Sequence, residues 1–136
     1  MKELKIQAVT DNLSEVLSFV DEQLEAADCP IKTQLQIDVA VEEIFVNIAH
    51  YAYASGSGPA ELCAGVNGDP PTFEMIFIDS GIPFDPLAKP DPDITLPAEK
   101  KQIGGLGIYI VKKTMDEVSY EYRDGHNYLT LKKVLA

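Results

Sequence analysis

Residues 72–79, with the sequence TFEMIFID, decide the fold of this 136-residue chain. Their odd-numbered apolar positions, which share one side of an extended strand, are Phe73, Met75 and Phe77. Ile76 and Ile78 make the opposite side apolar as well. A strand that is apolar on both sides is typical of the centre of a sheet. We therefore predict a β-sheet with this segment as its central strand.

Four further segments have the pattern of strands. Residues 4–8 alternate between apolar and polar side chains, and residues 60–66 precede the central strand across a turn rich in glycine and proline. Residues 118–122 and 129–131 flank Asp124-Gly125, a dipeptide that favours a tight turn, so we expect them to form a closing hairpin.

Three segments have helical spacing instead: residues 13–24, residues 31–53, and a short stretch after Gly107. In the second of these we expect the core-facing side chains to be Leu35, Ile37, Val41, Ile44 and Ile48. The strands come in adjacent pairs and do not alternate strictly with helices. The order predicts an α+β fold, a two-layer α/β sandwich in which a mixed, mostly antiparallel sheet carries its helices on one face. We expect residues 1–136 to form a single domain.

The charge of the chain restricts its partners. Only 11 lysines and arginines stand against 22 acidic residues, which gives a net charge of −11. Nucleic-acid binding depends on clustered basic side chains, so we expect no nucleic-acid partner. The sequence has no apolar run of membrane-spanning length and its first residues are charged, so we expect no membrane segment, no signal peptide and a cytoplasmic location.

A long segment, at about 82–103, has neither helical nor strand periodicity. Five of the nine prolines of the chain lie in it, between Pro83 and Pro97. A loop of this length inside a compact domain is usually functional or disordered, and this one separates two glycine motifs. We predict a lid over a bound ligand.

The first glycine motif is Asp79-Ser80-Gly81, which ends the central strand. A buried carboxylate needs hydrogen-bond donors, and the amino group of adenine is a suitable one. Gly81 has no Cβ, so a base could approach the backbone closely. The alternative is an ordinary turn, which this tripeptide also forms.

The second motif is Gly104-Gly105-Leu106-Gly107, directly before a helical pattern. Free N–H groups at the start of a helix can hold a phosphate, and Lys101 is near enough in sequence to reach a terminal phosphate. The alternative is a simple junction between a loop and a helix.

A third motif lies on the long helix, where Glu43 and Asn47 are spaced i, i+4 and share a face. The side-chain oxygen of Asn47 is a suitable ligand for Mg²⁺, and Glu43 is a candidate general base that accepts a proton from a hydroxyl or from water. The alternative is a solvated helix edge.

The order of these motifs resembles that of the GHKL family of ATP-binding domains, with one asparagine-containing box and two glycine-containing boxes. The resemblance extends over nearly the whole chain and is strongest to the stand-alone anti-sigma factor serine/threonine kinases of bacteria. The segments that carry it are residues 41–53 (VEEIFVNIAHYAY), 79–86 (DSGIPFDP), 105–111 (GLGIYIV), 115–118 (MDEV) and 125–131 (GHNYLTL).

The resemblance implies the histidine-kinase-like ATPase fold and an ATP- and Mg²⁺-dependent serine/threonine protein kinase. Glu43 would be the catalytic base and Asn47 the Mg²⁺ ligand. Asp79 would bind the adenine. The remaining nucleotide-binding residues would be Gly81, Lys101, Gly104, Gly105, Leu106 and Gly107.

The implied partners are a sigma factor and an antagonist protein that carries the acceptor serine, and a homodimer is also expected. Related proteins often have an arginine near the second glycine box, where this chain has Lys100 and Lys101. Lysine lacks the planar fork of arginine. An alternative is therefore a catalytically weak regulator that captures partners in a nucleotide-dependent way. A self-contained ATPase and an interaction domain without nucleotide are further alternatives.

Overall fold

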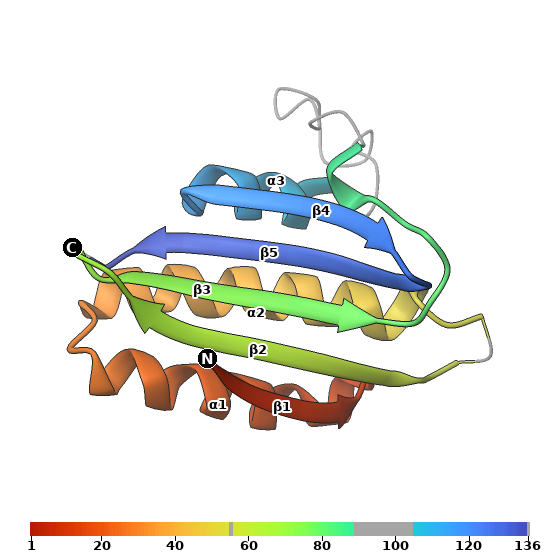
Figure 1. Cartoon of the computed structure of the whole chain (residues 1–136), viewed down its shortest axis with the longest axis horizontal. Helices are drawn as coiled ribbons and strands as arrows, with labels where there is room; N and C mark the ends of the chain where they lie inside the picture. The colour runs from red at the N-terminus through yellow and green to blue at the C-terminus, as the bar shows by residue number, and fades with distance from the viewer. Residues whose placement is uncertain (55, 89–104, 136) are drawn as a thin grey trace.

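A computed structural model of the chain describes residues 1–54, 56–88 and 105–135 (Figure 1). Its five strands form one sheet in the order β1-β2-β3-β5-β4, with β3 at the centre as predicted. The strands are β1 (Lys2–Gln7), β2 (Pro59–Asn67), β3 (Thr72–Asp79), β4 (Glu117–Arg123) and β5 (His126–Val134). Each of the four pairings is antiparallel, so the described sheet has no parallel pair.

Three α-helices lie together behind the sheet in Figure 1. They are α1 (Leu13–Ala26), α2 (Ile31–Tyr51) and α3 (Gly105–Thr114), and short 3₁₀ turns cover Thr10–Asn12 and Pro86–Ala88. The predicted α+β two-layer class, with helices on one face of the sheet, is confirmed. The predicted lid at about 82–103 lies outside the described residues from position 89 onward. No helix in the described ranges combines the length and the apolar character that a membrane span requires.

The core lies between the sheet and the helices. Phe73, Met75 and Phe77 of β3 are at most 1% exposed and point toward α2, as the alternation of the strand predicts. Phe45 and Ile44 of α2 are at most 2% exposed and pack into the same core. α2 therefore lies directly over the central strands. The polar residues of α2 that neighbour these core positions are thereby placed close to the sheet.

The prediction was wrong for one of the expected core residues of α2. Leu35 is 58% exposed and belongs to a second apolar stripe on the outer side of α2, together with Ile31 and Val39. Leu35 lies two residues before the buried Ile37, which is about 200° around a helix with 3.6 residues per turn. The two side chains therefore point to opposite sides.

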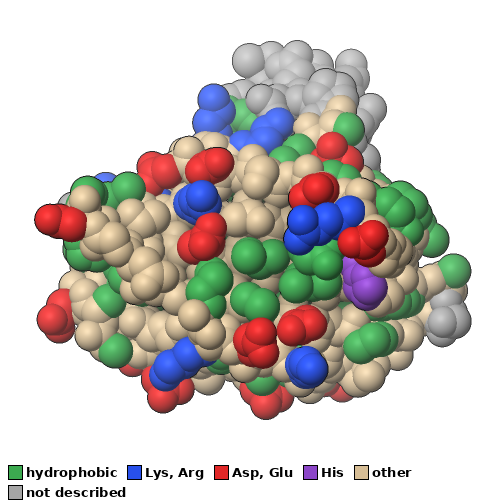
Figure 2. Space-filling view, viewed as in Figure 1, with side chains coloured by type: hydrophobic (Ala, Val, Ile, Leu, Met, Phe, Trp, Pro, Cys, Tyr) green, Lys and Arg blue, Asp and Glu red, His purple; other side chains and the backbone are tan. Residues whose placement is uncertain are grey.

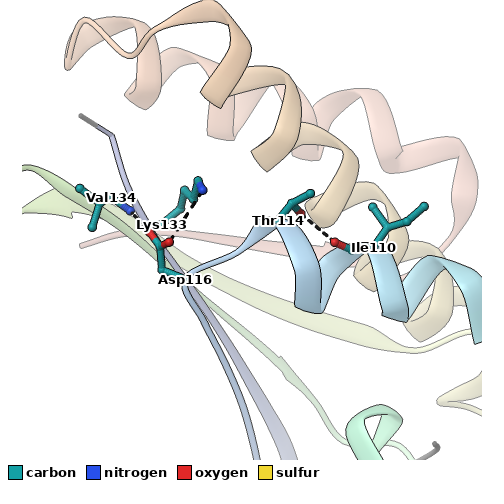
Figure 3. Close-up of polar contacts among 5 residues, drawn as sticks. All are labelled: Ile110, Thr114, Asp116, Lys133 and Val134. Atoms are coloured by element: carbon teal, nitrogen blue, oxygen red, sulfur yellow. Dashed lines mark hydrogen bonds and ion pairs between the residues drawn. The ribbon is translucent and has the colours of Figure 1, made fainter. Parts of the chain in front are cut away.

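The end of α3 is fixed to the sheet by the first residues after the helix (Figure 3). The hydroxyl of Thr114 donates to the carbonyl oxygen of Ile110 over 2.9 Å within the last turn. Asp116 Oδ2 then accepts from the N–H of Val134 at 2.6 Å, and Asp116 Oδ1 lies 3.8 Å from the ammonium nitrogen of Lys133. These contacts join α3 and the start of β4 to β5.

The opposite face of the sheet carries no helix among the described residues. Figure 2 looks onto this face, where acidic and basic side chains lie among hydrophobic ones. Lys132 on β5 pairs there with Glu74 on β3 and Glu117 on β4, at N–O distances of 3.5 and 3.6 Å. The sheet thus has one core face and one solvated face, as is common for antiparallel sheets.

Two carboxyl groups meet between the first two helices. Asp21 lies on α1 and Asp38 on α2, and the Oδ1 atom of each is buried without a hydrogen bond from the described residues. Burial raises the pKa of Asp38 to about 8, and repulsion from the nearby carboxylates of Asp21 and Glu25 adds to the shift. Asp38 therefore keeps its proton at neutral pH, which removes its own charge from this buried position.

Replacing Asp38 by asparagine is expected to flatten the pH dependence of stability. Because the folded-state pKa is raised, the folded chain holds a proton that the unfolded chain releases, and stability falls as the pH rises from about 4 through 8. The amide introduced by Asp38→Asn would donate to Asp21 at every pH. Asp38 is only partly buried and therefore screened by solvent, which limits the gain to about 1 kcal/mol at pH 8.

Urea unfolding at pH 5, 7 and 8.5 measures this effect. The exposed Asp11, changed to asparagine, is the control and should leave the slope of stability against pH as in the unmodified chain. A slope that is the same for Asp38→Asn and the unmodified chain would contradict the raised pKa of Asp38.

Candidate functional site

A pocket lies where the end of the central strand meets the second half of α2. It encloses about 430 Å³, counting the open space at its mouth. Its apolar lining comes from Ile44, Ile48, Ala52, Phe77, Ile82, Phe84, Pro86 and Leu129, and its polar lining from Asn47, Asp79, Tyr120 and Asn127. An apolar slot with a few convergent polar groups is the usual form of a small-molecule site.

Asp79 is the buried carboxylate of this pocket, at 6% exposure. Its Oδ1 atom accepts two hydrogen bonds of 2.9 Å, one from the N–H of Gly81 and one from Nδ2 of Asn127. Its Oδ2 atom accepts none from the described residues. An ionised carboxylate has about four acceptor positions, so Asp79 retains the capacity to accept a hydrogen bond from a ligand in the pocket.

Gly81 is required by a close approach of two backbones. A Cβ at this position would overlap the carbonyl group and the Cβ of Ala52, which follows α2. The next N–H, of Ile82, donates to the same Ala52 carbonyl oxygen at 2.9 Å. The absence of a side chain at Gly81 thus lets the loop after β3 lie directly against the end of α2 and close that side of the pocket.

Changing Gly81 to alanine is expected to destabilise the protein by about 1–3 kcal/mol, since backbone must move to accommodate the new methyl group. Urea unfolding measures the loss. Gly65→Ala is the matched control, because a Cβ there meets Met1 Cγ at 3.4 Å, an ordinary contact. Equal stability of the two variants would show that there is room for a methyl group between Gly81 and Ala52.

The other two candidate residues of α2 lie one turn apart. Asn47 lines the pocket, and Glu43 lies one turn earlier, facing the first turn of α3. A Cβ on Gly107 would overlap the carboxylate of Glu43. Because Gly107 has no side chain, the carboxylate of Glu43 can lie against the backbone of α3.

The structure therefore brings most of the predicted site residues together. Asn47 and Asp79 line one pocket, Gly81 supports its wall, and Glu43 contacts Gly107 beside it. Glu43 and Gly107 are not part of the pocket lining itself. Gly105 and Leu106 form the first turn of α3. Gly104 and Lys101 lie outside the described residues, and the roles predicted for all of these residues stay predictions.

The sequence motifs missed two polar residues of the pocket, Tyr120 on β4 and Asn127 on β5. Asn127 is 6% exposed and occupies the first inward-facing position of a strand whose next inward residues are Leu129 and Leu131. A polar residue in a series of core-facing positions is the signal that could have revealed it, because such a residue needs buried partners.

Comparison with known proteins matches the chain to one family of ATPase domains and to bacterial protein kinases. The family model described as "Histidine kinase-like ATPase domain" matches residues 6–133. The serine-protein kinase RsbW of Bacillus cereus strain AH187 is 29% identical over 100 residues, which cover 71% of this chain and 61% of that protein. The serine/threonine-protein kinase BtrW of Bordetella bronchiseptica is 26% identical over 100 residues, with 74% and 70% covered. The chain thus spans about three fifths of the length of the first of these relatives.

Two solved structures share the fold. A Mycobacterium tuberculosis protein with RsbU and RsbW domains superposes with a TM-score of 0.68 at 19% identity, covering 99% of this chain and 33% of the other. The SiaB–SiaC complex of Pseudomonas aeruginosa gives a TM-score of 0.60 at 17% identity, with 96% and 88% covered.

Proposed function

Because this chain belongs to the histidine kinase-like ATPase family, we propose that it is an ATP- and Mg²⁺-dependent serine/threonine protein kinase. In this proposal it works in the cytoplasm as an anti-sigma regulatory factor and phosphorylates a serine of an antagonist protein. The names of its relatives, serine-protein kinase RsbW and serine/threonine-protein kinase BtrW, support the proposed chemistry.

The observation that carries the nucleotide part of the proposal is the environment of Asp79. An apolar slot with one carboxylate among its described lining residues suits adenine, which has an apolar ring face and an amino group that donates. Oδ1 of Asp79 already holds Gly81 and Asn127, and this leaves the carboxylate able to accept from the base. Guanine has a carbonyl oxygen at the same ring position, and two acceptors would then face each other.

The catalytic part of the proposal rests on Glu43. Its carboxylate lies against Gly107 at the start of α3, one helical turn from Asn47. In our proposal, Glu43 accepts the proton of the serine hydroxyl of the antagonist, and the backbone at the start of α3 orients the phosphates. Mg²⁺ would be held through the side-chain oxygen of Asn47 and would neutralise phosphate charge. Positioning and charge stabilisation supply most of the catalysis in phosphoryl transfer.

The proposed protein partners rest on the resemblance to the anti-sigma factor kinases. The SiaB–SiaC structure is a complex, and its likeness to this chain is one of fold. We propose an antagonist protein with an acceptor serine and a sigma factor as the two partners, and a homodimer as the working form. The net charge of −11 supports protein partners over nucleic acid.

One sequence feature favours a second candidate. Lys100 and Lys101 stand before the second glycine motif, where related kinases often carry arginine. A lysine supplies charge but no bidentate hydrogen bonding to phosphate. The second candidate is therefore a catalytically weak ATP-binding regulator that captures its partner when nucleotide is bound.

Two measurements test the proposal in sequence. Calorimetry with ATP and Mg²⁺ should show binding to the purified protein, and absence of binding would refute both candidates. Incubation with labelled ATP and candidate antagonist proteins, beginning with the products of neighbouring genes, should then transfer label to a serine. Retained ATP binding without transfer would favour the regulator, and release of free phosphate alone would indicate an ATPase.

A further inference from the structure

Asn127 is a buried amide whose hydrogen-bonding capacity is fully used. Its Nδ2 donates to Asp79 Oδ1 and to the carbonyl oxygen of Ile82, both at 2.9 Å. Its Oδ1 accepts from the hydroxyl of Tyr120 and from the N–H of Phe84, the latter at 3.3 Å. A side-chain amide has two donor hydrogens and two acceptor lone pairs. Asn127 therefore has nothing left to offer a ligand, although it lines the pocket.

Tyr120 fixes which way this amide points. Its hydroxyl donates to Oδ1 of Asn127 and accepts from the N–H of Phe84 at 3.2 Å. Burial raises the pKa of this hydroxyl, so it keeps its proton at neutral pH and stays a donor. With an oxygen required toward Tyr120, the NH₂ group of Asn127 must point toward Asp79.

Tyr120 and Asn127 together set the orientation of Asp79. The Asn127 amide and the Gly81 N–H both bind Oδ1, so Oδ1 is held toward β5 and the loop. We propose that Tyr120 and Asn127 are positioning residues that hold Asp79 with Oδ2 available to the ligand, and so give the pocket its selectivity for a purine with an exocyclic amino group. The proposal rests on the proposed function, since it explains how that site would distinguish its base.

The test compares two nucleotides that differ only in the group Asp79 would bind. Dissociation constants are measured by calorimetry, with Mg²⁺, for ATP and for purine riboside triphosphate, which lacks the 6-amino group. The unmodified protein should bind ATP about 10- to 100-fold more tightly, the range for a hydrogen bond to a charged group. The variants are Tyr120→Phe, which keeps the ring, and Asn127→Ala.

The matched control is Tyr122→Phe, two residues along β4 and 43% exposed. It should keep the full ratio between the two nucleotides. Tyr120→Phe should reduce the ratio of the two dissociation constants by a factor of at least about three. In Asn127→Ala the ratio itself should be smaller than about three. Thermal unfolding of each variant shows whether it is folded under the conditions of the binding measurement. If Asn127→Ala does not fold, the result for Tyr120→Phe alone tests the inference.

The outcomes separate this inference from the proposed function. Weaker binding of both nucleotides with an unchanged ratio would mean that the pair has only a structural role, and would overturn the inference alone. A ratio near one in the unmodified protein would also overturn it, because Asp79 would then not bind the amino group. Absence of ATP binding to the unmodified protein would refute the proposed function itself.

Discussion

Replacing Glu43 by glutamine is expected to lower the rate of phosphate transfer by about 10²- to 10⁴-fold, the usual contribution of a positioned general base. Glutamine has nearly the same size and cannot accept the proton of the incoming serine. Glu43 lies beside the pocket and not in its lining, so the affinity for ATP should change less than threefold, about 0.6 kcal/mol.

Glu42→Gln is the matched control for this experiment, because Glu42 is the adjacent acidic residue and is exposed to solvent. It should transfer phosphate at the rate of the unmodified protein. Single-turnover transfer to the antagonist protein is the measurement, with ATP affinity from calorimetry beside it. Transfer by Glu43→Gln at the rate of the control would exclude Glu43 as the base.

The second large effect is expected from Asp79→Asn, which should weaken ATP binding by about 10- to 100-fold. The N–H of Gly81 and the amide of Asn127 both require an acceptor at position 79. The oxygen of the introduced amide would satisfy them, and its NH₂ group would then point into the pocket. Facing the amino group of adenine, this NH₂ group would set donor against donor.

The same geometry predicts a change of preference in the Asp79→Asn variant. An NH₂ group in the pocket can donate to the carbonyl oxygen of inosine triphosphate, so the ratio of ATP to inosine triphosphate affinity should fall. Asp85→Asn is the control: Asp85 is exposed in the same loop and its Oδ1 accepts from the N–H of Leu87 at 2.8 Å, which asparagine can also do. Equal ATP affinity of the two variants would exclude Asp79 as the adenine-binding residue.

The sheet and the helix layer could be predicted from the sequence because each depends on local periodicity. The alternation along residues 72–79 identified β3 and its central place, and the spacing of Ile37, Val41, Ile44 and Ile48 identified the inner face of α2. Leu35 was misassigned because apolar residues occur on both sides of this helix. Periodicity alone does not say which of two apolar stripes the sheet covers.

The pocket was only partly predictable for a different reason. Asp79 and Asn47 belong to short sequence motifs, whereas Tyr120 and Asn127 are brought to the pocket by the pairing of the strands. Asn127 reaches Asp79 because β5 pairs with β3 across 48 residues of sequence, and the register places the two residues opposite each other. That register follows from the packing of the whole sheet, and no local pattern contains it.

The position of β3 in the sheet has a consequence for how a ligand would be bound. Asp79 has a strand partner on each side, Ala60 on β2 and Asn127 on β5, so its backbone has little freedom before any ligand arrives. A recognition group that is already immobile costs little entropy to engage. We therefore expect the base-binding end of the pocket to be a rigid template, and adaptation to different partners to arise elsewhere in the protein.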